Sequence, residues 1–278
     1  MNIVLFYPVE RLLHICGFYT FFESYYAEDF YFEGEHHNFW EVVYCLGGTT
    51  GISADEKIYR LRPGDLAIHR PLVHHKLWSE ESTRAHVLIF SFNGDGALLK
   101  GLGGAYSCDM ELQKQWNDLF CRLKESGCRS SCTGFLQHLQ KHPAELQAIT
   151  NLCENNLLAL KEQGLPLGYN QSKNALDYER IIQTMKRNLS NNLTVEELGL
   201  LCGLSASSMK KLFRHFNSMG IHEYFLHLKM KEAVRLLEEG KTVTETAELL
   251  GFSNQSYFST AFKREMNEIP ARFRRNRS

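Results

Sequence analysis

Apolar residues recur at helical spacing through the last hundred residues of the chain. Residues 178–185 carry four apolar side chains on one side of a helix, and the polar run 188–192 ends it. Residues 222–239 repeat this spacing over a longer stretch, and Gly240 follows where a left-handed residue often closes a helix. The pattern predicts an all-α region with a long central helix.

Two segments of this region share the order of a helix, a glycine turn and a second helix. Each starts with a threonine that can cap a helix N-terminus, Thr194 or Thr242, followed by acidic residues that favour the positive end of the helix dipole. The turn glycines, Gly203 and Gly251, lie 48 residues apart and supply a left-handed backbone. Each second helix has an apolar inner side and a polar outer side bearing lysine or arginine. This arrangement predicts tandem helix-turn-helix units, which offer a helix to the DNA major groove.

The residues from about 30 to 92 show short alternating runs separated by turns. Residues 39–46 are rich in β-branched and aromatic side chains and end at a Gly-Gly turn. Residues 57–61 alternate before the turn at 63–65, and further short runs follow. Because no helical stripe interrupts these runs, we expect an antiparallel sandwich or small barrel.

Two helical stripes follow the expected strands, at 112–123 and at 146–160. A helix with one apolar stripe needs a partner, which is either the barrel of the same chain or a second copy of the protein. The segment 164–176 contains glycines and a proline and has no stripe, so a linker is expected there. The expected domains are therefore 1–163 and 177–278.

Charge is distributed unevenly between these domains. The formal net charge of the 278 residues is −1, but residues 177–278 hold 16 basic and 12 acidic side chains, whereas the remainder holds 15 and 20. A basic helical module joined to an acidic module is typical of a nucleic-acid-binding domain with a separate partner domain. The chain has no apolar run of about eighteen residues and no basic segment at its start, so a cytoplasmic protein is expected. The eight cysteines are expected to be reduced thiols.

The C-terminal part of the chain resembles the AraC-type transcriptional regulators. The resemblance covers about residues 178–275 and is strongest over 244–264, and Pro270 followed by Phe273 matches the usual ending of the family. It implies two helix-turn-helix units bridged by a long helix. Three positions depart from the family pattern, with serine or asparagine in place of glycine or lysine in place of arginine: Ser218, Asn267 and Lys229. Asn267 is expected to keep a positive φ, and Lys229 to weaken a structural or phosphate contact.

The N-terminal part resembles the cupin-like sensor barrel of the same family. The similar segments are His36-His37 to Glu41, the Gly47-Gly48 turn, the turn at 63–65 and the segment 71–75. The resemblance implies a multidomain α+β chain. It further implies that an antiparallel β cupin-like barrel with packed helices senses a ligand and dimerises, and that an all-α tandem helix-turn-helix domain follows.

The outer sides of the two recognition helices carry the residues expected to contact DNA. Inner positions are assigned to Met209, Leu212 and Phe213 in the first helix, and to Tyr257, Phe258, Ala261 and Phe262 in the second. Glutamine reads adenine, hydroxyls contact bases or phosphates, and lysine and arginine do both. The expected DNA-binding residues are Ser207, Ser208, Lys210, Lys211, Arg214, Gln255, Ser256, Ser259, Thr260 and Lys263.

A set of histidines, carboxylates and aromatic residues in the barrel region is expected to bind a ligand. His37 and Glu41 are four residues apart, so they share one face of a strand, and His75 follows a later turn. Metal-binding cupins use His and Glu from these regions, but usually as His-x-His, so neither a metal nor a cofactor is expected. The same groups can hydrogen-bond a hydroxylated ligand, and a barrel that is filled and only dimerises is the remaining alternative. The expected ligand-binding residues are His37, Trp40, Glu41, Tyr44, His69, His75 and Trp78.

These features favour a ligand-responsive, sequence-specific regulator that binds double-stranded DNA and activates transcription. The expected effector is a small molecule such as a carbohydrate, and the expected partners are a second copy of the chain and RNA polymerase, with no membrane and no enzymatic activity. Ligand binding would shift how the two DNA-binding domains of a dimer sit on their half-sites. Two alternatives stay open: a metal-dependent cupin enzyme with a DNA-binding tail, and an effector-independent DNA-binding protein.

Overall fold

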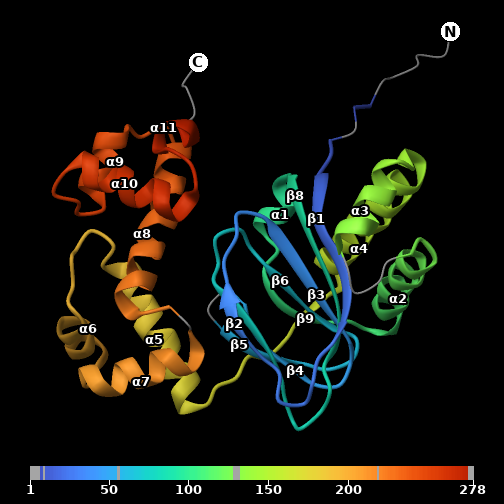
Figure 1. The fold of residues 1–278 in the computed structure, drawn as a ribbon, viewed down its shortest axis with the longest axis horizontal. Helices are drawn as coiled ribbons and strands as arrows, with labels where there is room; N and C mark the ends of the chain where they lie inside the picture. The colour runs from blue at the N-terminus through green and yellow to red at the C-terminus, as the bar shows by residue number, and fades with distance from the viewer. Residues whose placement is uncertain (1–6, 9, 55–56, 128–131, 218, 275–278) are drawn as a thin grey trace. The chain divides into compact units, whose positions relative to one another are not determined.

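The computed structural model describes residues 7–8, 10–54, 57–127, 132–217 and 219–274. The chain divides into two units, Met1–Tyr169 and Asn170–Ser278 (Figure 1). Each unit has its own buried apolar core. The first is an antiparallel β structure with packed helices and the second is all-α, which confirms the expected fold class. Within the described residues, no helix has the length and apolarity needed to cross a membrane.

Two antiparallel sheets form the first unit. The six-stranded sheet runs in the order β1 (His14–Tyr25), β8 (His86–Asp95), β3 (Trp40–Gly47), β6 (Asp65–His69), β9 (Gly104–Ser107) and β10 (Leu165–Pro166). The four-stranded sheet runs in the order β2 (Tyr31–Glu35), β7 (His75–Ser79), β4 (Thr50–Ala54) and β5 (Lys57–Leu61). The sequence analysis missed β1, which precedes the region where strands were expected and pairs with β8 along its length.

Side-chain alternation gives the six-stranded sheet two buried faces. In β3, Val43 and Cys45 join the apolar core between the sheets, together with Ile52 and Leu77 of the opposite sheet. Tyr44, between them in sequence, belongs to a second core on the outer face of the six-stranded sheet. The interior of the barrel and its helix-covered side are therefore lined by alternate residues of the same strands.

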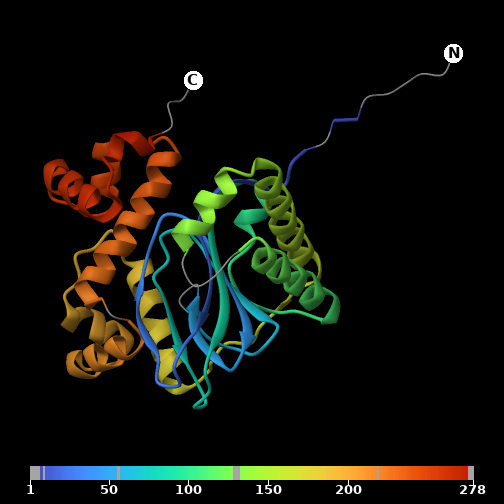
Figure 2. The ribbon, with the colours of Figure 1, turned by 45° about the vertical axis from the view of Figure 1, so that its right-hand side comes forward.

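Helices cover the outer face of the six-stranded sheet, as Figures 1 and 2 show. The short α1 (Ala97–Lys100) precedes α2 (Met110–Glu125), α3 (Cys132–Gln140) and α4 (Pro143–Gln163). The stripe of α2 is buried at Leu112, Trp116, Leu119 and Leu123, with Phe120 partly buried beside it, and α4 adds Ile149, Leu157 and Leu160 to the same core. The stripes therefore pack mainly on the barrel of their own chain.

The segment 164–176, expected to be a linker, is partly structured. Leu165–Pro166 pair with β9 as strand β10. Helix α5 (Lys173–Arg187) already begins within the segment, where the side chain of Ser172 accepts a bond from the N–H of Ala175. Within this segment, Gly164 and residues 167–172 lie in neither helix nor strand, and the chain divides into its two units between Tyr169 and Asn170.

The second unit has the expected tandem arrangement. It consists of α5, α6 (Val195–Cys202), α7 (Ala206–Phe216), α8 (Ile221–Glu238), α9 (Val243–Leu249), α10 (Gln255–Met266) and α11 (Pro270–Phe273). Thr194 and Thr242 cap α6 and α9, as expected, and Gly203 and Gly251 have φ of 65° and 72° in the two turns. Helix α8 contacts helices on both sides of the unit and bridges the pairs α6–α7 and α9–α10.

Two of the departures from the family pattern have clear structural consequences. Asn267 has φ of 56°, which confirms that it keeps the left-handed turn. Lys229 is buried, and its Nζ donates to Asn192 Oδ1 and to the carbonyl oxygen of Leu250, each at 2.9 Å. Its contact is therefore structural. Ser218 lies outside the described residues.

Candidate functional site

A cavity of about 240 Å³ opens inside the barrel, between the two sheets. Aromatic and aliphatic side chains form most of its wall, and two carboxylates and two imidazoles stand together in it. The lining residues are Phe22, Tyr26, Phe30, Phe32, Val43, Leu77 and Ile89 on the apolar side, and Glu35, Glu41, His69 and His75 on the polar side.

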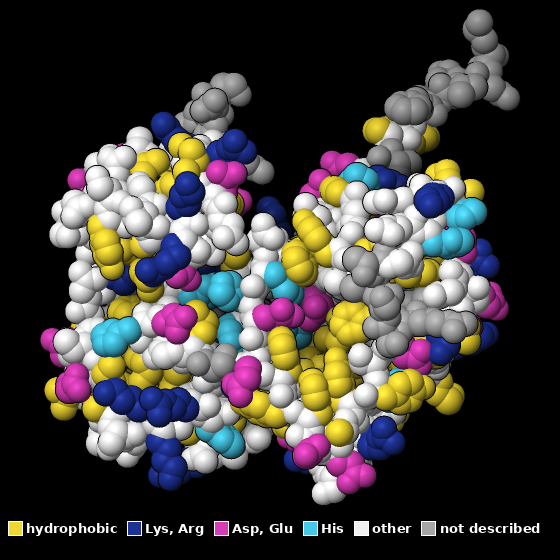
Figure 3. All heavy atoms as spheres, in the orientation of Figure 1, with side chains coloured by type: hydrophobic (Ala, Val, Ile, Leu, Met, Phe, Trp, Pro, Cys, Tyr) yellow, Lys and Arg dark blue, Asp and Glu magenta, His cyan; other side chains and the backbone are white. Residues whose placement is uncertain are grey.

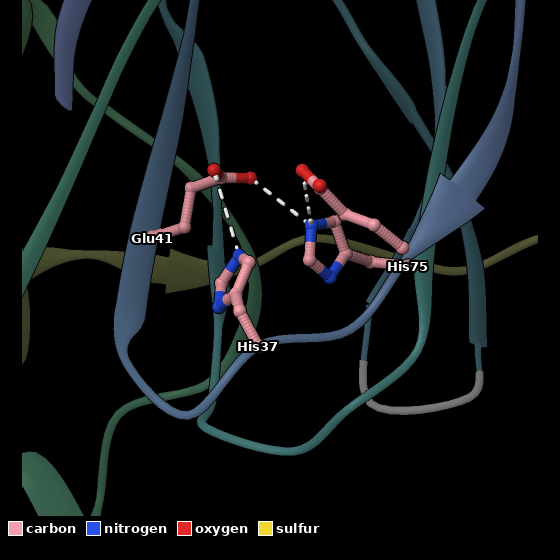
Figure 4. A group of neighbouring side chains, drawn as sticks. His37, Glu41 and His75 are labelled. Atoms are coloured by element: carbon pink, nitrogen blue, oxygen red, sulfur yellow. Dashed lines mark ion pairs between the residues drawn. The ribbon is translucent and has the colours of Figure 1, made fainter. Parts of the chain in front are cut away.

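Strand pairing brings the polar residues together. Glu41 of β3 lies directly opposite His69 of β6, and His75 at the start of β7 pairs with Glu35 at the end of β2. His37 lies in the loop before β3, and its Nε2 is 3.7 Å from Glu41 Oε2. Figure 4 shows the Glu41 carboxylate facing the rings of both His37 and His75. The Nε2 of His75 is 3.2 Å from Glu41 Oε1.

The protein environment shifts the ionisation of this group. Burial by itself would raise the pKa of the Glu41 carboxyl, but its interactions with His37 and His75 hold that pKa well below the usual range. Burial also opposes protonation of His75, yet the neighbouring Glu41 carboxylate raises its pKa. Burial lowers the pKa of His69 well below its usual value, and its ring stacks on that of His75 with centroids 4.0 Å apart. An ionised carboxylate and a neutral imidazole thus share one buried end of the cavity.

Of the seven expected ligand-binding residues, Glu41, His69 and His75 line the cavity and His37 contacts Glu41. Trp40, Tyr44 and Trp78 do not line it. Trp40 and Tyr44 alternate with Glu41 and Val43 along β3, so they pack on the outer face, where the Tyr44 ring stacks on Trp116. Trp78 has the opposite parity to Leu77, and its Nε1 donates to Glu80 Oε1 at 3.1 Å.

The apolar wall was missed by the sequence analysis. Phe22 belongs to β1, which had not been assigned, and Tyr26 and Phe30 lie in the loop between β1 and β2. Glu35 was also missed, because only its pairing with His75 brings it to the site. The alternation of Phe32 with Tyr31 and Glu33 is a sequence signal that could have assigned Phe32 to the wall of the cavity. It lies at the start of the region expected to form strands.

Helix α7 presents the polar side that the sequence predicts. Met209 and Phe213 are buried and Leu212 is half-buried, whereas Ser207, Ser208, Lys210, Lys211 and Arg214 are exposed. Ser205 caps the helix: its Oγ accepts the N–H of Ser208 at 3.1 Å. Lys and Arg side chains gather over this helix in Figure 3.

Helix α10 exposes a more neutral surface. Gln255, Ser256, Thr260 and Lys263 are exposed and Ser259 is half-buried, while Phe258, Ala261 and Phe262 are buried. The expectation that Tyr257 packs inward is wrong, because its side chain is 58% exposed. The cap of α10 is Asn254, so Tyr257 stands at the helix position that Ser208 occupies in α7, on the outer side.

Comparison with known protein families matches both units. A model of the AraC-like ligand binding domain matches residues 17–139, and a helix-turn-helix domain model matches residues 198–276. The chain belongs to the AraC-type transcriptional regulators. The first match contains the cavity, and the second contains both recognition helices.

Curated relatives of this AraC-type regulator are themselves named as regulators. It is 31% identical over 123 residues to the Msm operon regulatory protein of Streptococcus mutans, covering 43% of this chain and 44% of that protein. It is 31% identical over 91 residues to an HTH-type transcriptional regulator of Pseudoalteromonas carrageenovora, covering 33% and 54%. The match thus spans about half the length of these two relatives. A longer match, 23% identical, covers 89% of this chain and 79% of the MmsAB operon regulatory protein of Pseudomonas aeruginosa.

Proposed function

We propose that this AraC-type regulator binds double-stranded DNA through α7 and α10 and activates transcription in response to a small molecule held in the barrel. The observation that carries the proposal is the pair of recognition helices. Each has a buried apolar side and an exposed polar side, and α8 bridges the two units that contain them. This is the geometry in which one side of a helix enters the major groove while the other holds it to its own domain.

We propose that α7 mainly contacts phosphates and that α10 mainly contacts base edges. Aligned at their caps, Ser205 and Asn254, they place Lys210, Lys211 and Arg214 of α7 at the positions of Ser259, Thr260 and Lys263 of α10. Three positive charges favour phosphate contacts by α7, whereas Gln255, Ser256 and Ser259 offer α10 groups that read base edges. Lys263 supplies the one cation of α10 within this aligned set.

DNA binding by the full-length protein tests this division. Sites selected from random DNA are titrated by fluorescence anisotropy at several salt concentrations. Lys210→Ala should weaken binding to every sequence and lower the salt slope by about 1. Ser259→Ala, at the aligned position of α10, and Lys100→Ala, an exposed lysine of the barrel unit, should leave the slope unchanged. An unchanged slope in Lys210→Ala would contradict the proposal.

The cavity supports a small polyhydroxylated effector, such as a monosaccharide. Its volume of about 240 Å³ is below the range of about 300–1,000 Å³ usual for larger ligands. The Glu41 carboxylate accepts hydrogen bonds from hydroxyl groups, and the neutral imidazole of His69 both donates and accepts. The aromatic rings of Phe22, Tyr26 and Phe30 would cover the carbon-bound face of such a molecule.

Thermal-shift measurements with monosaccharides and sugar acids test the effector class. A binding sugar should raise the melting temperature of the wild-type protein, and Ile89→Trp, which fills the cavity, should abolish that rise. If no compound of this class stabilises the wild-type protein, the carbohydrate proposal fails. Transcription in vitro with RNA polymerase then tests activation: the effector should increase transcript from a selected site, and a decrease would make the protein a repressor.

We further propose that the regulator acts as a homodimer through its barrel unit and contacts RNA polymerase when bound to DNA. The apolar stripes of α2 and α4 pack mainly within the chain, so we expect the dimer contact to use residues of this unit that stay exposed. Sedimentation of the full-length protein and of residues 1–169 tests this. Monomeric behaviour of both at tens of micromolar would contradict it. The cytoplasmic location expected from the N-terminal sequence stays a prediction.

A further inference from the structure

Four metal-ligating side chains converge at the polar end of the cavity. We define the His–Glu cluster as Glu35, His37, Glu41 and His75, each of which offers one ligand atom, all within 4.8 Å of one another. They come from the end of β2, the loop before β3, β3 itself and the start of β7. The fold thus assembles the cluster from separate elements that strand pairing holds in register.

The two histidines are oriented to present a free nitrogen to the cluster. The Nδ1 of His75 lies 3.0 Å from the carbonyl oxygen of Val73, and the Nδ1 of His37 lies 3.0 Å from that of Phe39. A carbonyl only accepts, so each Nδ1 carries a proton, and Nε2 is the ring nitrogen that is left to bind an ion when it is deprotonated. Both Nε2 atoms are buried and lack a hydrogen-bond partner among the described residues. Metal-binding histidines are commonly held by this type of bond through the nitrogen that does not bind the metal.

The distances within the cluster are those of ligands around an ion. The separations are 3.2 Å between His75 Nε2 and Glu41 Oε1, 3.7 Å from His37 Nε2 to Glu41 Oε2, and 3.9 Å from His75 Nε2 to Glu35 Oε1. Charge-assisted hydrogen bonds between such atoms are shorter, about 2.7–2.9 Å. Two ligands about 2.1 Å from a tetrahedral centre lie about 3.4 Å apart. These three separations are longer than charge-assisted hydrogen bonds and close to the spacing of ligands that share one cation.

We propose that the His–Glu cluster binds one divalent transition-metal ion, such as Zn²⁺, through the Nε2 atoms of His37 and His75 and the carboxylates of Glu41 and Glu35. Two imidazoles favour this class over Ca²⁺ and Mg²⁺, which prefer oxygen ligands, and two carboxylates balance its charge. Glu35 is the most exposed ligand, at 53%, so it is the one that an oxygen atom of a bound effector can replace. The adjacent histidines His36 and His37 do not both contribute ligands to the cluster. The ligands from this segment are Glu35 and His37, which lie two residues apart.

His69 extends the site toward the apolar wall. Its ring stacks on His75, and neither ring nitrogen has a hydrogen-bond partner within the described part of the chain. It is almost fully buried, at 1% exposure, and lines the cavity beside the cluster. A molecule coordinated to the ion would bring its polar groups within reach of this imidazole. This proposal goes beyond the proposed regulation of transcription, because the ion would be bound with or without DNA.

Direct metal titration of the full-length protein tests the proposal. The protein is stripped with EDTA, and Zn²⁺ alone is added in a calorimeter. One ion per chain should bind and raise the melting temperature. Co²⁺ should give the visible absorption of a nitrogen- and oxygen-ligated four- or five-coordinate centre. Absence of stoichiometric Zn²⁺ binding would overturn the proposal. DNA binding is measured separately on the same stripped protein, so failure of the metal site is distinguishable from failure of the proposed regulator function.

Substitutions locate the bound ion. His75→Gln and Glu41→Gln should each weaken Zn²⁺ binding by 100-fold or more, and Glu35→Gln by about 10-fold. Glu35→Gln changes a half-exposed side chain, so it stays informative if the two buried substitutions prevent folding. The matched control is His138→Gln, because the rings of His138 and His142 lie 4.3 Å apart on the surface and can bind a stray ion. Zn²⁺ binding lost in His138→Gln but retained in Glu35→Gln would overturn the proposal.

Discussion

The two helix-turn-helix units of residues 170–278 begin in the same way. Thr194 accepts the N–H of Glu197 at 3.2 Å, and Thr242 accepts the N–H of Glu245 at the same distance. In each unit the carboxylate of the glutamate accepts in turn the N–H of the threonine, at 2.8 Å and 2.7 Å. These reciprocal caps span three residues, so local sequence alone accounts for the likeness.

The units differ at their turn glycines. Gly203 and Gly251 both have a left-handed backbone. A Cβ on Gly203 would meet no atom within 4 Å among the described residues, whereas one on Gly251 would lie 2.1 Å from the carbonyl oxygen of Ser190. Asn192 also donates its Nδ2 to the carbonyl oxygen of Gly251 at 2.8 Å. The second turn is therefore packed on the segment before the first unit, and its glycine has a packing role that the first glycine lacks.

Gly251→Ala is expected to show the largest difference between the units. A left-handed alanine costs about 1–2 kcal/mol at either turn, so Gly203→Ala should lower the free energy of unfolding by this amount. Gly251→Ala adds overpacking against the backbone of Ser190, for a total loss of about 3 kcal/mol or more. Urea unfolding of the full-length protein, followed by helical circular dichroism, measures both. Equal losses would show that the second turn is no more tightly packed than the first.

Lys229→Met tests the hydrogen bonds by which helix α8 joins the segments of the two helix-turn-helix units. It removes the amine that donates to Asn192 Oδ1 and Leu250 O, which should lower the free energy of unfolding by about 1 kcal/mol near neutral pH. The exposed Lys241 supplies the control, Lys241→Met, for which a change below about 0.5 kcal/mol is expected. A destabilisation of the same size in both variants would mean that the buried amine does not join the units.

The lowered pKa of Lys229 predicts that the free energy of unfolding depends on pH. Burial lowers the pKa of Lys229 to about 8, below the value of 10.5 for the unfolded chain. From pH 8 to pH 10.5 the unfolded state therefore holds more protons than the folded state, and this residue makes the folded protein more stable as the pH rises. The stability of the wild-type protein relative to Lys229→Met should increase across this window. A constant difference between pH 7 and pH 10 would contradict it.

Gln255→Ala and Lys263→Ala should separate base contacts from phosphate contacts within α10. Gln255 stands at the start of the helix, where its Oε1 accepts a bond from Thr244 Oγ1 at 2.9 Å. Its loss should cost about 1–3 kcal/mol at a preferred site and relax the preference at one base pair. Lys263→Ala should weaken all sequences alike and lower the salt slope. Titrations on a selected site and its single-base variants decide this. Uniform loss in both variants would leave base recognition to α7.

Tyr257→Ala is expected to have the smallest effect. The side chain is 58% exposed, so its removal should change the free energy of unfolding by less than about 1 kcal/mol. The neighbouring Phe258 is buried, and Phe258→Ala should cost about 3–5 kcal/mol. Thermal or urea unfolding of the two variants gives the contrast. A loss above 2 kcal/mol in Tyr257→Ala would restore the inward position that the spacing of α10 first indicated.

Tyr257 was predicted to be buried but is exposed, and this error shows how far the exposed side of α7 and α10 can be predicted from the sequence. Nearly every outward residue of α7 and α10 follows from helical periodicity, because the inner side of each helix must be apolar. Tyr257 is an aromatic residue on the outer side, where Ser208 stands in α7. Periodicity alone cannot distinguish an exposed aromatic residue from a buried one when both are adjacent to a core position.

The barrel cavity was less predictable than the helices. Glu41 and His75 were found because their residue types stand out, but Trp40 and Tyr44 were assigned to the wrong side of β3. A strand turns successive residues to opposite faces, and in this sheet both faces are buried, so hydrophobicity does not tell which face holds the cavity. Strand β1 was missed, and with it Phe22 of the cavity wall.

The sequence by itself determined the two helix-turn-helix units, their caps and their turns, and it singled out Glu41, His69 and His75, which line the cavity. These features depend on bonds and spacings within about ten residues, or on side chains of distinctive chemistry. The tertiary structure alone decided that the helical stripes cover the barrel, that Gly251 packs against Ser190, and that Glu35 joins His37, Glu41 and His75. Each of these depends on the pairing of segments far apart in the chain, where a shift of one residue in register would turn a side chain to the opposite face.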